Sequence, residues 1–388
     1  MCDANIIKDL LDVENRQTLF KNILSQLRSY SDSKGIHYYE FETHEGIIPI
    51  LVIAKSLNPD KVKSLKVFVG AQHNEYNGLF GIIEFLKMLQ KSLIQIDEIL
   101  IGEQMLIFAP LMNPYGFLNP TIENKSGYHL KNGTNLNRFW RRTFAPEYKD
   151  DENDLNQYPI PEHAKIFKNL LAKYWERDHI SIYILDFHET SLLGKFLTNL
   201  SNNLQKNSIT YKFSHWLEEE ILHNIIELNK IRFTRNPLFY KCNSDADHSH
   251  INLTIKQLDI VYQNLQDYIL RNNEKLPFYF CYSNRSKEIC QFFAQKVYEK
   301  LKDNLWETIF PAYKHNFTNH GCFVNLNDAT IRKNVYSIEL ESLKQFFNIF
   351  DEIDKSKADK YYFDKKIKKF QLSTQLVVES INQMIKLF

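Results

Sequence analysis

The sequence predicts an α/β fold with a mixed, mostly parallel central sheet flanked by helices, plus a helical insertion. Two observations support this class: apolar, strand-like runs alternate with amphipathic helical patterns, and polar clusters follow several of the runs. Sheets of this class bind ligands beside the carboxyl ends of their strands, so the clusters mark a candidate site. We expect one domain over residues 1–388, with an N-terminal helix at 5–29 and the insertion at about 200–290.

The elements of the first third of the chain follow from its apolar spacing. Residues 5–29 repeat apolar side chains near helical spacing, until "SDSKG" breaks the pattern. The stretch "IHYYEFETHEGIIPILVIA" predicts two strands around a turn at 44–46, and "SLNPDK" then predicts a loop. We expect a central strand at "LKVFVGAQ". We expect a helix after residue 75, because apolar residues there recur at spacings of three and four residues.

The rest of the chain continues the alternation. Further strands are predicted at "MLIFAPLM", "ISIYILDFHE", "LPFYFCYS" and "NVYSIELE", with helices between them such as 163–177 and 286–302. Two long helical patterns fill 200–275, which is why we interpret this part as an insertion. The run "DADHSH" at 245–250 is interpreted as a polar loop of that insertion.

Composition excludes several classes of partner. Lys and Arg number 48 against 47 for Asp and Glu, a balance of +1 that attracts neither nucleic acid nor anionic lipid, so we expect no nucleic acid and no membrane as partner. The N-terminal stretch lacks the basic start and apolar run of a signal peptide. The 5 cysteines are odd in number and scattered, which suits free thiols in a reducing compartment. These features predict a cytoplasmic protein.

The polar clusters contain the residue types of a metal or acid/base site. They are "QHNE" at 72–75, "NPYG" at 113–116, "NLNR" at 135–138, "DFHE" at 186–189 and "YSIELE" at 336–341. Histidine and glutamate are frequent ligands of zinc. Glu339 lies between two apolar strand residues, where a carboxylate is costly to bury unless it is paired or functional.

In this order, over about residues 65–345, the clusters resemble those of the zinc carboxypeptidase superfamily. The resemblance implies one zinc ion held by a His-x-x-Glu pair and a later histidine, which places ligands at Gln72, Glu75 and His188. Gln72 stands where the family has its first histidine, as in a branch of peptidoglycan-trimming carboxypeptidases. A shift of one residue would make His73 the ligand instead, and this alternative stays open.

The resemblance also assigns roles to the other clusters. It implies that Glu339 is the general base and that Asn137 and Arg138 bind the carboxylate of the substrate. Asp186 could orient the second nitrogen of a ligand histidine. The arginine that the family often places between the "NPYG" turn and the Asn-Arg pair is missing, because residues 117–134 contain only lysines as cations.

These expectations define a zinc-dependent hydrolase that cleaves an amide bond next to a free carboxylate, foremost a metallocarboxypeptidase acting on peptides. A deacylase of small acylated amino acids, of the succinylglutamate desuccinylase and aspartoacylase type, is the alternative within the superfamily. A third possibility is a pseudoenzyme that only binds. The retained Glu75, His188 and Glu339 favour an enzyme.

Overall fold

The computed structural model describes most of the chain outside the expected insertion. The described ranges are 9–190, 278–301, 312–314, 321–329, 334–344 and 360–388, with gaps at 11, 13, 34, 92–93, 95–96, 98–99, 101–102, 122–123, 125 and 149–152. The insertion expected at about 200–290, up to residue 277, and the "DADHSH" run therefore lie outside the described residues.

Eight described strands form one sheet in the order β1-β2-β4-β3-β5-β8-β6-β7. They are β1 (Ile36–Thr43), β2 (Gly46–Ala54), β3 (Ser64–Val69), β4 (Gln104–Ala109), β5 (Ser181–Thr190), β6 (Phe278–Tyr282), β7 (Ala312–Lys314) and β8 (Val335–Leu343). The central strands β4, β3, β5 and β8 are parallel, whereas the pairs β1·β2, β2·β4 and β6·β8 are antiparallel and β6·β7 is parallel. This arrangement confirms the predicted mixed, mostly parallel sheet.

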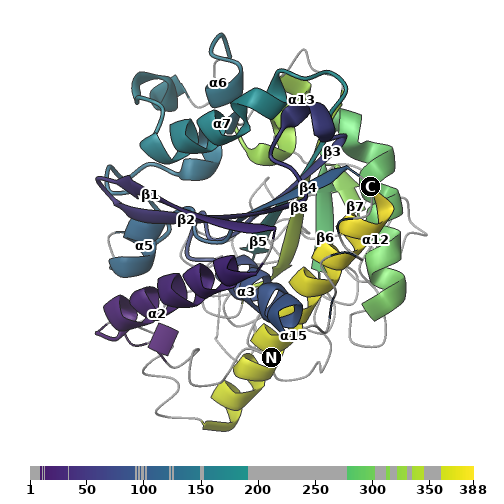
Figure 1. Ribbon diagram of the computed structural model, residues 1–388. Coiled ribbons are helices and arrows are strands. Elements are labelled where there is room, and N and C mark those ends of the chain that lie inside the picture. Colours follow the sequence, from purple (N-terminus) through teal and green to yellow (C-terminus); the bar gives the residue numbers. More distant parts are fainter. Residues whose placement is uncertain are drawn as a thin grey trace, which may run out of the picture.

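Helices cover both faces of the sheet (Figure 1). On one face lie α6 (Trp140–Phe144), α7 (Glu162–Trp175) and α13 (Leu326–Ala329), and on the other lie α2 (Arg16–Ser29), α3 (Asn77–Gln90) and α15 (Lys360–Leu387). Short α5 (Pro114–Leu118) follows β4, and α12 (Lys287–Leu301) follows β6. None of the described helices combines the length and the apolar character needed to span a bilayer.

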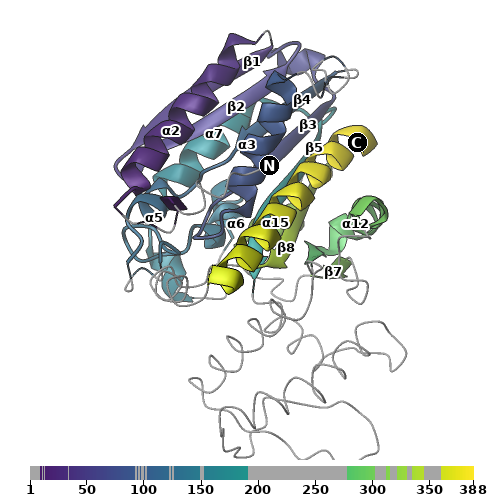
Figure 2. The same cartoon turned by 90° about the horizontal axis from the view of Figure 1, so that it is seen from below.

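The period of two in the strands divides the core between the two faces. In β3, Val67 and Val69 belong to the cluster that includes residues of α7, while Phe68 belongs to the cluster with α3 and α15. Figure 2 shows α15 lying alongside α3. A Cβ atom at Gly81 of α3 would lie 2.4 Å from the side chain of Val377, so the two helices pack at the closest spacing there.

Side-chain hydrogen bonds and backbone conformation set the boundaries of two elements. Helix α2 begins at Arg16, because the Asp12 carboxylate accepts hydrogen bonds from Glu14 N and from Asn15 Nδ2 and so forms a turn before it. Strand β3 ends at Val69, three residues before the predicted end. The reason is Ala71, whose φ of 41° turns the backbone out of the extended conformation.

Candidate metal centre

The segment between β3 and α3 places four polar side chains over the carboxyl ends of the central strands. The backbone N of Asn113 donates to Ala71 O at 3.0 Å, and the backbone N of Tyr76 donates to Glu189 Oε2 at 3.0 Å, so both ends of the turn are held. The side chains of residues 72–75 are all buried. The strained Ala71 is consistent with a functional turn.

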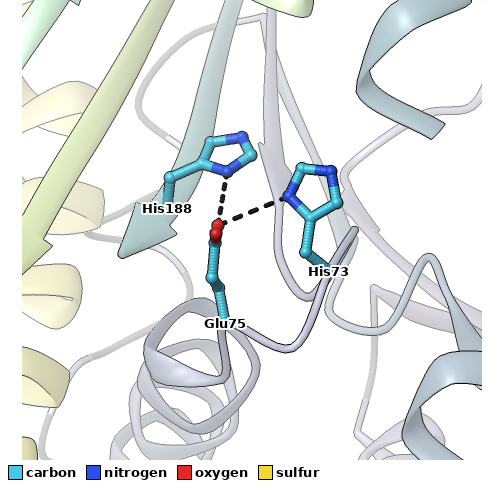
Figure 3. A group of neighbouring side chains, drawn as sticks. All are labelled: His73, Glu75 and His188. Carbon is cyan, nitrogen blue, oxygen red and sulfur yellow. Dashed lines mark hydrogen bonds and ion pairs between the residues drawn. The ribbon is translucent and has the colours of Figure 1, made fainter. Parts of the chain in front are cut away.

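His73, Glu75 and His188 converge at this point (Figure 3). Glu75 Oε2 lies 2.6 Å from His188 Nδ1 and 3.5 Å from His73 Nδ1. His188 comes from β5, and the other two residues come from the turn after β3. The three side chains offer two imidazole nitrogens and one carboxylate oxygen, which is a common set of protein ligands for a catalytic zinc.

The outer nitrogen of each imidazole lies against an oxygen acceptor. His73 Nε2 lies 2.6 Å from Asn135 Oδ1, and His188 Nε2 lies 2.8 Å from Asp186 Oδ2. When the proton of each ring sits on this outer nitrogen, the inner Nδ1 presents a lone pair. A metal-ligating histidine is held in this way in most metalloproteins, so the residues present fit a zinc ion.

The buried charges of the cluster are unequal. Burial opposes the charge of Glu75, but His188 and His73 hold the pKa of Glu75 well below its usual range. Burial also opposes the charge of His188, but Asp186 and Glu75 hold the pKa of His188 well above its usual range. Burial raises the pKa of Asp186, and His188 offsets this only in part. Two carboxylates, Glu75 and Asp186, therefore flank the imidazole of His188. This environment favours a positive charge at His188, from a proton or from a bound metal ion.

Gln72 points to a different set of partners. Its Nε2 donates to both oxygens of Asp186 at 2.7 Å, and its Oε1 accepts a hydrogen bond from Trp140 Nε1 at 2.6 Å. Both ends of the amide are thus engaged, and the Nε2 end supports Asp186, which in turn contacts His188. The ligand set with Gln72 stays a prediction, while the described geometry groups His73 with Glu75 and His188.

Glu339 lies beside the cluster, on the strand next to His188. It is the register partner of Asp186 across β5 and β8, and it is buried. Asp186, His188 and Glu339 each offer a ligand atom within 4.8 Å of the others, so they form a second group with metal-ligand residue types. Asp186 already contacts Gln72 and His188, which makes this second group the weaker candidate for a metal.

Asn137 and Arg138 follow in the short helix η3 (Leu136–Arg138). Asn137 Oδ1 accepts from the backbone N of Phe323 at 3.1 Å, and its Nδ2 lies 3.3 Å from His188 Nε2. Arg138 is half-buried and donates to Asn137 O at 2.9 Å and to Cys322 Sγ at 3.1 Å. Asn137 therefore contacts the centre and Arg138 is its neighbour in the chain, and their predicted substrate contacts stay predictions.

Sequence reasoning missed two residues of the centre. Tyr128 stacks on the His73 ring at 4.2 Å between centroids and 13° between planes, and burial raises the pKa of Tyr128 to about 12. Lys344 Nζ donates to Asn74 Oδ1 at 2.5 Å and lies 3.9 Å from Glu75 Oε1. Tyr128 lies within 117–134, the stretch in which the resemblance implies an arginine rather than a phenol.

The "NPYG" turn holds the loop that carries Tyr128. Asn113 Oδ1 accepts from Gly116 N at 2.8 Å, and Asn113 Nδ2 donates to His129 O at 3.3 Å. A Cβ atom at Gly116 would lie 2.1 Å from Gly127 O, and one at Gly127 would lie 2.1 Å from Gly116 O. Gly127 also has a φ of 97°, so both positions require glycine.

Comparison with known proteins finds likeness at the level of structures. No protein-family model and no curated protein sequence matches the chain. A metallo-carboxypeptidase from Pseudomonas aeruginosa in complex with (2-guanidinoethylmercapto)succinic acid is similar at 13% identity and a TM-score of 0.46, over 94% of this chain and 67% of that chain. Bovine thrombin-activatable fibrinolysis inhibitor in complex with tick carboxypeptidase inhibitor is similar at 10% identity and a TM-score of 0.47, over 94% of this chain and 96% of that chain.

A third neighbour is carboxypeptidase A from Helicoverpa armigera, with 10% identity and a TM-score of 0.42, over 91% of this chain and 71% of that chain. At these identities and scores, we draw the chemistry of the site from the residues of this chain alone.

Proposed function

We propose that this chain is a zinc-dependent hydrolase that cleaves an amide bond next to a free carboxylate, most specifically a metallocarboxypeptidase. The observation that carries the proposal is the convergence of His73, Glu75 and His188, with the outer nitrogen of each imidazole held by an oxygen acceptor. In the metal-free protein a proton lies between His188 Nδ1 and Glu75, and a metal ion that replaces this proton would be bound by the same two atoms.

The ligands in this proposal are His73, Glu75 and His188. Gln72 is not a ligand in this proposal, because its amide already contacts Asp186 and Trp140. It orients His188 indirectly, through Asp186. The register with His73 was the open alternative of the sequence, and the grouping of the side chains favours it.

The other residues supply the remaining chemistry. A zinc ion bound by these ligands would polarise the scissile carbonyl and lower the pKa of water. Glu339 takes a proton from the attacking water and hands it to the leaving amine. Arg138, with Asn137, binds the free carboxylate of the substrate, for which a planar guanidinium is suited. A peptide is the proposed substrate, ahead of a small acylated amino acid.

The test has two parts. Elemental analysis of the purified protein should find about one zinc per chain, and His188→Ala should lose it. The zinc-loaded protein should hydrolyse a blocked dipeptide with a free C-terminal carboxylate far faster than the same dipeptide as its amide. Equal rates would contradict the carboxylate contact, and no hydrolysis of either substrate by zinc-loaded protein would contradict the enzyme. An N-acyl amino acid assayed in parallel distinguishes the deacylase.

A further inference from the structure

The hydroxyl group of Tyr128 has a proton that is available to donate in a hydrogen bond. Its oxygen accepts from Asn135 Nδ2 at 3.2 Å. A phenol also carries one proton to donate, and none of the described residues accepts it. The side chain is half-buried, in contrast to the buried His73 on which it stacks, so a substrate could approach it.

Tyr128 is close to the groups that would bind the reacting part of a substrate. Its ring contacts His73, one of the proposed zinc ligands. Its hydroxyl is bonded to Asn135, which also contacts His73 Nε2 and precedes the short helix η3 that carries Asn137 and Arg138. A substrate whose free carboxylate binds Arg138 and whose scissile carbonyl lies at the metal cluster would therefore pass close to this hydroxyl.

We propose that the Tyr128 hydroxyl donates a hydrogen bond to the carbonyl oxygen of the scissile amide and stabilises the negative charge that develops there. This role rests on the proposed function. Water adds to the carbonyl carbon, the carbon–nitrogen bond breaks, and the proton that Glu339 took from water goes to the amine. Tyr128 keeps its own proton throughout, because it acts only as a donor.

Asn135 fixes the direction of this donor. Its Oδ1 contacts His73 Nε2 at 2.6 Å, and its Nδ2 donates to the Tyr128 oxygen at 3.2 Å. One amide therefore orients both rings, and it leaves the phenol proton available. A carboxylate at position 135 would accept that proton instead. A donor that is oriented before the reaction needs no rearrangement when the charge develops.

The decisive variant is Tyr128→Phe, which keeps the ring on His73 and removes only the hydroxyl. We expect unchanged zinc content and a kcat lower by about 10²- to 10³-fold for the blocked dipeptide acid, since this is the usual cost of removing one such donor. KM should change little. Affinity for the phosphonate analogue of the dipeptide should also be lower in Tyr128→Phe than in native protein. Affinity for the product amino acid should be the same in both.

A matched control is Tyr38→Phe, which removes a hydroxyl bonded to Glu40 on β1, at the far edge of the sheet. It should leave kcat unchanged. Asn135→Asp should lower kcat as Tyr128→Phe does, with little further loss in the double variant, because both changes withdraw the same proton.

Several outcomes would overturn the proposal. A kcat of Tyr128→Phe within about threefold of the native value would do so, far below the loss expected for such a donor. Loss of zinc from the variant would show that Tyr128 serves to hold His73. If native protein hydrolyses no dipeptide, the proposed function fails. Phosphonate binding measured by calorimetry then still decides the role of Tyr128. Equal affinity in native protein and Tyr128→Phe refutes that role, and so does the absence of binding to either protein.

Discussion

The choice between His73 and Gln72 as a zinc ligand can be decided by two substitutions that preserve shape. His73→Phe keeps an aromatic ring against Tyr128, where the centroids are 4.2 Å apart, and removes only the nitrogens. Gln72→Met keeps the length of the side chain and removes the amide, whose nitrogen donates to Asp186 and whose oxygen accepts from Trp140. Each variant therefore tests one register with little disturbance of packing.

The expected magnitudes differ. Zinc sites that drive folding bind with about 10–16 kcal/mol, so one of three ligands accounts for roughly 3–5 kcal/mol, or about 10²- to 10⁴-fold in Kd. A residue that only orients a ligand costs about 10- to 100-fold. Gln72→Met removes two hydrogen bonds to a buried carboxylate, so we also expect it to lower the free energy of unfolding by about 3 kcal/mol.

The assay combines two measurements on each purified variant. Competition with a chromophoric chelator gives the Kd for zinc, and urea unfolding of the metal-free protein gives the free energy of unfolding. We expect the larger loss of zinc affinity in His73→Phe and the larger loss of stability in Gln72→Met. If Gln72→Met loses more zinc affinity than His73→Phe, the ligand set proposed above is wrong and the ungapped register is right.

Three further predictions concern other buried groups. Glu339→Gln should retain zinc yet lose about 10²- to 10⁴-fold in kcat as a missing general base, and native turnover would exclude that role. Lys344→Met, which removes a cation 3.9 Å from Glu75, should destabilise the metal-free protein by about 3 kcal/mol in urea, whereas Lys296→Met, at an exposed pair, should change little. Burial lowers the pKa of Lys66 to about 7, below its value in the unfolded chain. From pH 7 to 10 the unfolded chain therefore holds the proton that the folded protein releases, and stability rises with pH. Lys66→Met should abolish that rise, and an equal slope in both proteins would contradict the assignment.

The fold could be predicted because its central strands are buried on both faces. Runs such as residues 105–109 and 181–185 are apolar at nearly every position, which is what parallel strands covered by helices require. The turn at Asp12 that precedes α2 could not be predicted, since it depends on side-chain hydrogen bonds that periodicity does not detect.

The site could be predicted in part for a related reason. Glu339 and His188 lie within strands, where the period of two fixes the face of each side chain. Residues 72–75 follow the end of β3, and the positive φ of Ala71 cancels that period, so the sequence could not choose between Gln72 and His73. Tyr128 depends on a packing contact between α5 and the loop after it, for which the sequence carries no periodic signal.

The contact between Gly116 and Gly127 has a consequence for how this protein can evolve. Each residue occupies the space that a methyl group on the other would need, so a substitution at either position has no compensating change at its partner short of moving a loop. The two positions should therefore stay glycine together or be lost together in related sequences. Loss of the pair would free the loop of Tyr128, and we expect such sequences to have replaced that tyrosine as well.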